Sequence, residues 1–265
     1  MHPVIQNLLN RAGKTVPIKD GRKIALVLFS GLMKGVRGAG AMIALEDLGL
    51  TNAFDEIYTF SCGFPNASYL LSKNIHLGST IWHEEMSGNK FINFLKFWKI
   101  ADIEKIIKVM QTKKPLNLKN IFQSRTKIYA RLSNLTMRID EYLEIHDAGK
   151  KNYFKLMKAA ISVPVLHRGS TQISGQIYTD AAKLDNSHIS AHFKHVLKSN
   201  ATDILCIYND ATQVINHSSQ QERIYSIFPN PKWKLNLLET GSEKLKNSAN
   251  QMELLVKEIF SRTKQ

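Results

Sequence analysis

The sequence predicts an α/β protein whose mostly parallel sheet is covered by helices on both faces. Apolar runs of strand length alternate with helical segments along the chain, which is typical of this class. The first run, residues 23–29 (KIALVLF), is rich enough in branched apolar residues to be a fully buried strand. The chain has 265 residues, of which 43% are hydrophobic, so a large domain can form its own core.

A glycine-bearing loop and a helix follow this strand. Residues 30–40 carry four glycines, which can free backbone N–H groups for an anion at the start of a helix. Residues 36–48 have helical periodicity. We interpret Gly38 and Gly40 inside that helix as positions where it approaches the sheet closely, since glycine otherwise lowers helix propensity.

A second strand, at about residues 57–60, ends in Ser61-Cys62-Gly63, and an apolar helix over residues 64–72 comes next. A serine between a buried strand and a helix is the context of a nucleophile elbow. The same position is also common for a turn residue or a helix N-cap. The glycine loop one strand earlier favours the elbow.

The rest of the chain continues the alternation. Residues 75–86 show no regular pattern, and residues 140–145 are too short to assign. We expect further strands at residues 125–132, 173–178, 203–208 and 223–228, and helices at residues 152–160, 191–198 and 241–262.

Residues 89–110 have apolar side chains at helical spacing. These residues are Phe91, Phe94, Leu95, Trp98, Ile103, Ile106, Ile107 and Met110. They fit either the core face of a helix or the wall of an acyl-chain site beneath a lid. We favour the core face.

The chain is strongly basic, with 36 Lys and Arg residues against 22 Asp and Glu residues and a formal charge of +14. Such a balance attracts phosphate polymers or anionic membrane surfaces. Lysines are densest over residues 96–119, but no zinc finger, RNA-binding aromatic motif or helix-turn-helix pattern accompanies them. We therefore expect no specific nucleic-acid partner and favour contact with anionic lipid head groups.

Two further features bear on location. The first 22 residues lack a positive segment followed by an apolar core, which excludes a Sec signal peptide, and residues 4–9 can form at most one or two amphipathic turns. Cys62 and Cys206 make neither a disulfide framework nor a metal pattern. We expect a cytoplasmic protein that can attach peripherally to a membrane.

A base for Ser61 is available from a later strand. Asp180 follows the strand predicted at residues 173–178, and an open α/β sheet gathers its site at the carboxyl ends of its strands. A serine hydroxyl is a weak nucleophile until a neighbour accepts its proton, and the N–H groups of Gly31 and Leu32 can bind the oxyanion that forms. Together these residues predict an acyl-transfer site, although Asp180 alone would more often be a cap or turn residue.

Three histidines, His188, His192 and His195, are spaced to share one helical face. A metal site or a Ser-His-Asp triad is conceivable there. No carboxylate or cysteine nearby completes a ligand set, so we expect no metal. His167, after Pro164, is interpreted as polar surface.

These motifs together resemble the patatin-like phospholipase family. Residues 25–40 (ALVLFSGLMKGVRGAG) are similar to its strand and G-G-G-x-[RK]-G loop, and residues 59–63 (TFSCG) to its G-x-S-x-G elbow. Residues 158–166 match its A-S-x-x-x-P segment, and residues 178–186 its D-G-G/A strand end. The matching positions are Ser30, Gly31 and Leu32 for the three loop glycines, Lys34 for the basic residue, Gly35 for the last glycine, Ser61 for the nucleophile and Asp180 for the dyad aspartate.

The resemblance implies a three-layer α/β/α domain with a Ser–Asp dyad, no catalytic histidine and no cofactor. The implied chemistry is hydrolysis of phospholipid or other lipid acyl esters, with Gly31, Leu32, Lys34 and Gly35 forming the oxyanion-binding loop. Motif order agrees over residues 23–209, and the closing strand and helix over residues 222–262 look like those of a bacterial branch. We expect an extension over residues 1–22 and one patatin-like domain over residues 23–265.

Several glycines of the family pattern are replaced. The replacements are Ser30 and Leu32 in the loop, Thr59 in the elbow, and Ala181 and Ala182 after the aspartate. They leave a second hypothesis open, in which a catalytically impaired member of the family binds lipid, a membrane or a protein partner.

Overall fold

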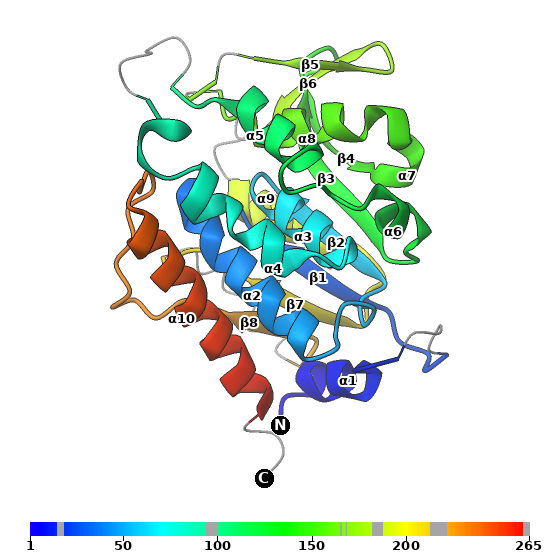
Figure 1. Cartoon of the computed structure of the whole chain (residues 1–265). Helices are drawn as coiled ribbons and strands as arrows, with labels where there is room; N and C mark the ends of the chain where they lie inside the picture. Colours follow the sequence, from blue (N-terminus) through cyan, green and yellow to red (C-terminus); the bar gives the residue numbers. More distant parts are fainter. Residues whose placement is uncertain are drawn as a thin grey trace.

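The computed structural model describes residues 1–14, 19–93, 100–164, 166–167, 169–181, 188–212 and 222–261. They form an eight-stranded mixed sheet, ordered β5-β6-β3-β2-β1-β7-β8, with β4 paired to β3 (Figure 1). The parallel strands are β1 (Ile24–Leu28), β2 (Glu56–Phe60), β3 (Lys127–Asn134), β7 (Asp203–Ile207) and β8 (Ile224–Ile227). The antiparallel pairs involve β4 (Ile139–Glu144), β5 (Thr171–Ile173) and β6 (Gln176–Asp180).

Helices cover both faces of the sheet, as the alternation of elements predicts. One face carries α2 (Val36–Asp47), α3 (Gly63–Leu71), α5 (Ile103–Gln111), α8 (Tyr153–Ile161) and α10 (Ser242–Ser261). The other face carries α9 (His188–Leu197). Along β1, Leu26 belongs to the first apolar core and Val27 to the second, because successive strand residues point to opposite faces. The predicted α/β class and buried first strand are confirmed.

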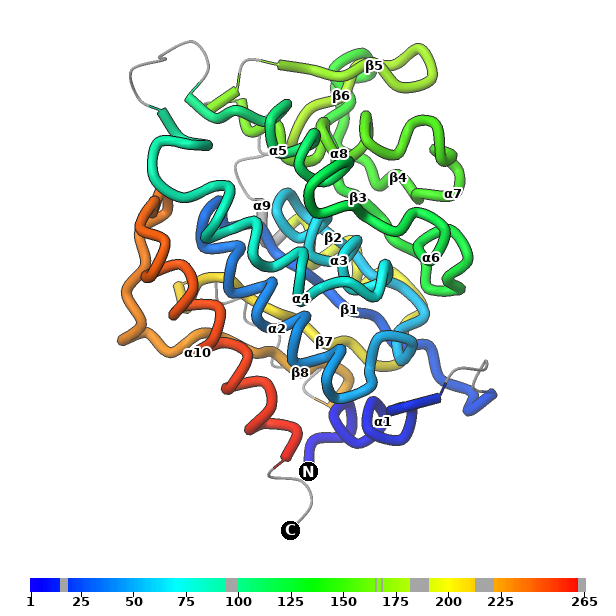
Figure 2. The backbone as a smooth tube through the Cα atoms, viewed as in Figure 1, coloured from blue at the N-terminus to red at the C-terminus, as the bar shows by residue number. Residues whose placement is uncertain are grey.

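Gly40 lets two helices touch. A side chain there would overlap the backbone carbonyl of Ala249 on α10, so α2 and α10 lie alongside each other (Figure 2). The predicted use of Gly40, close approach to the sheet, is therefore wrong. At Gly38, by contrast, the nearest atoms to an added Cβ are side-chain atoms, from Asn66 and Asn209.

Residues 89–110 do not form one helix. A 3-10 turn spans Gly88–Lys90, Ile92 pairs with Ala101, and α5 begins only after Asp102, whose carboxylate caps it by accepting the Lys105 N–H. Phe94, Leu95 and Trp98 lie outside the described residues. The cap and the local β-bridge explain why the periodic pattern starts a new helix instead of continuing one.

Several smaller elements differ from the sequence prediction. Residues 75–86 contain α4 (Ile75–Ser79) and a π-helical turn, η2 (Ile81–Glu85). Residues 140–145 belong mainly to strand β4. The helix α1 (Pro3–Arg11) is longer than the one or two turns expected and buries Val4, Ile5 and Leu8. Across the described part of the chain, no helix has the length and hydropathy of a membrane span.

Candidate active site

Ser61 stands at the turn between β2 and α3 with a φ of 53°. A left-handed conformation is uncommon for a residue with a side chain and persists where the surroundings enforce it, often at functional sites. Gly63 shows one such constraint, because a Cβ there would lie 2.8 Å from Leu28 Cβ and 2.9 Å from Leu28 O. The elbow thus packs directly on β1, and the predicted strand–turn–helix context of Ser61 is present.

Thr59 replaces the first glycine of the elbow pattern, and its side chain fits within the sheet. Its side chain is fully buried, and its hydroxyl donates to the Tyr129 carbonyl oxygen of β3 at 2.9 Å. The threonine therefore satisfies its polar group within the sheet. Crowding at this position is no obstacle to the elbow.

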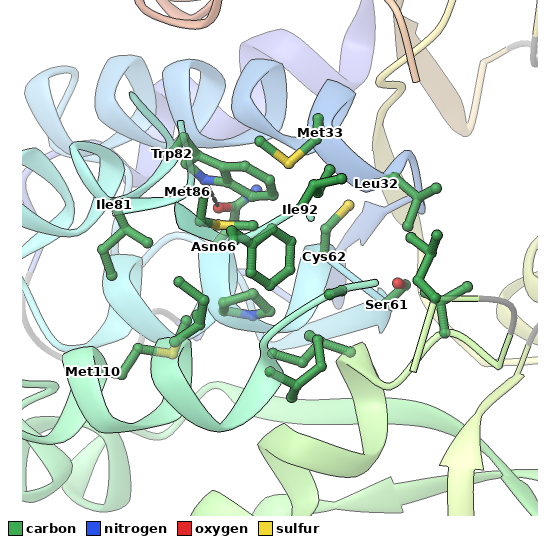
Figure 3. Close-up of a pocket in the computed structure, with 18 of the residues that line it drawn as sticks. Leu32, Met33, Ser61, Cys62, Asn66, Ile81, Trp82, Met86, Ile92 and Met110 are labelled. Atoms are coloured by element: carbon green, nitrogen blue, oxygen red, sulfur yellow. Dashed lines mark hydrogen bonds between the residues drawn. The ribbon is translucent and has the colours of Figure 1, made fainter. Parts of the chain in front are cut away.

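An apolar pocket opens beside Ser61, with an empty volume of about 700 Å³ that includes its mouth. Figure 3 places the Ser61 hydroxyl at one end of the labelled side chains and Ile81 and Met110 at the other. The apolar wall is built largely from Leu32, Met33, Tyr69, Ile81, Trp82, Met86, Phe91, Ile92, Ile103, Ile106, Met110, Ile161 and Leu166. The apolar face of α5 thus serves the core, as expected, and also the wall of a cavity.

Strand register brings Asp180 close to the elbow. Phe60 pairs with Arg131 across β2 and β3, and Asp180 pairs with Leu132 across β6 and β3. Ser61, one residue beyond Phe60, and Asp180 therefore flank Leu132, with about two strand spacings, or about 10 Å, between their Cα atoms. Paired residues project from the same face, and Leu132 belongs to the core on the pocket side. The buried side chain of Asp180 thus projects toward the pocket side.

The pKa of Cys62 is a second indication that Asp180 lies close to the elbow. Burial raises the pKa of the Cys62 thiol to about 12, and the negative charge of Asp180 is the next cause. The carboxylate is thus near enough to act on the residue that follows Ser61. The Ser61 hydroxyl itself makes no hydrogen bond within the described part of the chain.

The loop after β1 lies against the elbow. The backbone N–H groups of Cys62, Gly31 and Leu32 all interact with the Cys62 sulfur, which lowers the pKa of the thiol against the larger effect of burial. The following N–H groups are already used, since Met33 donates to Leu237 O at 3.2 Å and Lys34 to Gly31 O at 2.9 Å. The N–H groups of Gly31 and Leu32 therefore lie against the elbow, together with that of Cys62. Their use as oxyanion donors stays a prediction.

The other two predicted loop residues have different surroundings. The Lys34 ammonium binds the carboxylate of Asp210, which follows β7. A side chain at Gly35 would collide with Cys62 Sγ and the Trp82 ring, so Gly35 permits close packing. Neither contact places these residues among the oxyanion donors.

His192 and His195 of α9 lie on the far face of the sheet. His192 is fully buried, and its Nδ1 lies 2.7 Å from the Tyr142 hydroxyl. His195 stacks on the Tyr142 ring with centroids 3.8 Å apart. Burial lowers the pKa of His192 to about 3, with the positive charge of Arg131 as the next cause. Within the described residues, no group of His, Cys, Asp and Glu side chains could hold a metal ion.

Some of the predicted site residues lie outside the described part of the chain, and the prediction for His167 is wrong. The side chain of His188 and the whole of Ala182 lie outside the described residues. His167 is not polar surface: it is 6% exposed, and its Nε2 lies 3.7 Å from Glu104 Oε1. Its acidic partner Glu104 belongs to α5, far from His167 in the sequence, so the local sequence does not predict this contact.

Sequence reasoning missed two asparagines of the site. Asn66 lines the pocket from α3, and Asn209 follows β7 at 2% exposure. Each bonds to the backbone of the loop after β1. A polar residue within the apolar helix predicted at residues 64–72 is a signal that could have identified Asn66. We find no comparable sequence signal for Asn209.

The fold is shared with a solved bacterial structure. VipD from Legionella pneumophila superposes with a TM-score of 0.54 at 10% sequence identity, over 96% of this chain and 72% of VipD. A chain of the SpcU–ExoU complex from the type III secretion system of Pseudomonas aeruginosa gives a TM-score of 0.34 at 13% identity, over 91% of this chain and 52% of that chain, which is too low to support a conclusion. No family model and no curated protein sequence matches this chain. The likeness to VipD supports the patatin-like resemblance at the level of the α/β fold alone.

Proposed function

We propose that the protein is a serine acyl hydrolase that acts on phospholipid or other lipid acyl esters. The observation that carries this proposal is the left-handed elbow of Ser61 at one end of an apolar pocket. A strained serine at a strand–helix turn that faces a pocket is the arrangement of a serine nucleophile. The patatin-like resemblance and the shared fold agree with it but do not carry it.

In the proposed reaction, Asp180 accepts the proton of the Ser61 hydroxyl while the oxygen attacks the ester carbonyl. The N–H groups of Gly31, Leu32 and Cys62 stabilise the oxyanion. The alcohol leaves with the proton held by Asp180, and an acyl-serine remains. Water then attacks the acyl-serine and gives a proton to Asp180. As the fatty acid leaves, Asp180 returns this proton to the Ser61 oxygen and the hydroxyl is restored. Because Ser61 and Asp180 are not hydrogen-bonded here, their approach must tighten when substrate binds.

The pocket wall argues for a hydrocarbon chain as the group that enters. Among the residues that the structure describes, none that lines the pocket carries a charge. Its polar groups are largely satisfied, since Trp82 donates to Asn66 at 3.3 Å and the Tyr69 hydroxyl to Lys114 O at 2.6 Å. A charged head group would lose its hydration there without a partner, so we place the acyl chain inside and the head group outside.

One observation favours the alternative, an impaired member of the fold that binds lipid or a partner. Leu32 occupies a glycine position of the family loop, and its side chain lines the pocket next to Ser61. That side chain can reduce the room for a tetrahedral intermediate. The basic charge of the chain would then serve binding to an anionic membrane surface, and no specific nucleic-acid partner is proposed.

A fluorophosphonate probe and p-nitrophenyl esters test the proposal. We expect labelling and turnover in the wild type, loss of both in Ser61→Ala, and a large loss of both in Asp180→Asn. Ser72→Ala is a matched control, because this buried serine at the opposite end of α3 donates to Tyr69 O and lies outside the pocket. Asp47→Asn controls for the loss of a carboxylate on the surface. Equal labelling in the wild type and Ser61→Ala would refute the proposal.

A further inference from the structure

One asparagine joins the two ends of the loop after β1. The Asn209 side-chain amide donates to Phe29 O at 2.6 Å and to Ser30 O at 3.3 Å. Its Oδ1 accepts from the Gly38 N–H at 2.9 Å. A single buried side chain thus fixes both the exit of β1 and the first turn of α2, and the segment between these points contains Gly31 and Leu32.

A second asparagine holds the middle of the same loop. Asn66 donates to Gly35 O at 2.9 Å and accepts from the indole N–H of Trp82 at 3.3 Å. The two asparagines meet at Gly38, where an added Cβ would lie 2.8 Å from Asn66 Nδ2 and 3.1 Å from Asn209 Oδ1. Glycine at this position therefore lets both amides reach the loop.

The loop needs such fixation because Leu32 holds a left-handed conformation with a φ of 47°. A leucine in that region is strained and stays there only when neighbouring contacts enforce it. At a family glycine position the backbone would adopt this conformation freely. Here the two side-chain amides bond to the backbone on both sides of Leu32, at Ser30 and at Gly35.

We propose that Asn209 and Asn66 are positioning residues that aim the N–H groups of Gly31 and Leu32 at the substrate oxyanion. This inference rests on the proposed acyl-hydrolase function. Oxyanion donors act only within a narrow geometry, so a small displacement of the loop weakens the transition state more than the bound substrate. Both amides act through the backbone and touch no reacting atom.

The two residues differ in one respect that a test can use. Asn66 lines the acyl pocket with Trp82, whereas Asn209 does not. Loss of the Asn66 side chain should therefore change both the rate and the dependence on acyl-chain length. Loss of the Asn209 side chain should lower the rate for every chain length alike.

The kinetic test compares Asn209→Ala and Asn66→Ala with Asn120→Ala as the control. Asn120 also donates its side-chain amide to a backbone carbonyl, that of Ser72 at 3.0 Å, but it lies outside the pocket. We expect Asn209→Ala to lower kcat on p-nitrophenyl esters by about 10- to 100-fold with KM within about twofold, less than the loss of a whole oxyanion donor. The control should keep the wild-type kcat. A kcat for Asn209→Ala that matches the control would overturn the inference.

Hydrogen exchange gives a readout that does not need turnover. In Asn209→Ala we expect faster amide exchange over residues 29–38, because the Gly38 N–H loses its acceptor, while Asn120→Ala leaves this peptide unchanged. If Asn209→Ala fails to fold, Asn209→Asp takes its place. The aspartate has the same size and keeps an acceptor for the Gly38 N–H, but when ionised it cannot donate to Phe29 O. The ester kinetics and the hydrogen exchange are then measured on this variant. Unchanged exchange would overturn the inference even in an inactive protein. A wild type that never reacts with fluorophosphonate would refute the proposed function, while exchange still decides whether the asparagines position the loop.

Discussion

Leu32 and Ser61 both hold left-handed backbone conformations, with φ values of 47° and 53°, and both side chains line the same pocket. One residue belongs to the loop after β1 and the other to the turn after β2, which are neighbouring parallel strands. Two strained residues at the same edge of the sheet indicate a functional site, because backbone strain of this kind clusters at such sites. The strain at Leu32 is also the easier of the two to test.

Leu32→Gly and Leu32→Ala remove the same branched side chain but differ in backbone freedom. We expect the glycine variant to have the higher free energy of unfolding, by about 1 kcal/mol, because only glycine adopts a left-handed conformation without strain. Chemical denaturation measures this difference. At ordinary helical positions an alanine variant is more stable than a glycine variant. If Leu32→Ala is also more stable than Leu32→Gly, residue 32 is not strained. If Leu32 crowds the oxyanion, ester hydrolysis should also rise in both variants.

The strand and turn that carry Ser61 were predictable because their signals are local. An apolar run followed by Ser61 and Gly63 specifies a buried strand and a sharp turn without reference to the rest of the chain. The buried strand β1 was predictable for the same reason. The position of Asp180 at a strand end was also predicted, although its approach to Ser61 depends on the register of β6 on β3.

The contacts that complete the site were not predictable, because their partners lie far apart in sequence. Lys34 meets Asp210, and Asn209 meets the loop after β1, across 170 or more positions. Single polar residues leave no periodic pattern that could predict such pairs. The π-helical turn η2, which carries Trp82, was missed because its spacing does not follow the 3.6-residue period that marks an α-helix.

Gly40→Ala should destabilise the protein, although alanine is the better helix former. The added methyl group would overlap the Ala249 carbonyl oxygen, and backbone atoms cannot yield as a flexible side chain can. We expect a loss of about 1–3 kcal/mol in the free energy of unfolding, measured by denaturant titration. Gly241→Ala is the control, since the nearest atom there is the carboxylate oxygen of the Glu239 side chain, which can move. A Gly40→Ala variant as stable as the wild type would show that α2 and α10 do not pack as described.

Stability should fall in mild acid because of His192. Its folded-state pKa is lowered to about 3, first by burial and then by the charges of Arg131 and His195, whereas an unfolded histidine titrates at about 6.5. Between these values the unfolded chain binds a proton that the folded chain does not. The free energy of unfolding therefore drops as pH falls below about 6.5, by up to about 1.4 kcal/mol per pH unit from this group.

The variant His192→Gln isolates this contribution. It removes the titrating ring and leaves a polar group that can face the Tyr142 hydroxyl. We expect its free energy of unfolding to fall less between pH 7 and pH 5 than that of the wild type. Identical pH dependence in the wild type and His192→Gln would show that His192 does not stay neutral in the folded state.

A larger residue at the far end of the pocket should shorten the acyl chain that the protein accepts. Met110 is buried on α5 and lines the pocket away from Ser61 (Figure 3). In Met110→Trp we expect kcat/KM for p-nitrophenyl dodecanoate to fall at least about tenfold, while kcat/KM for the butyrate stays within about twofold, because only the long chain reaches the filled space. Met137→Trp is the control, since Met137 is 60% exposed. An equal loss for both esters would mean that the substitution disturbs the site in general, and an unchanged preference would place the acyl chain outside this pocket.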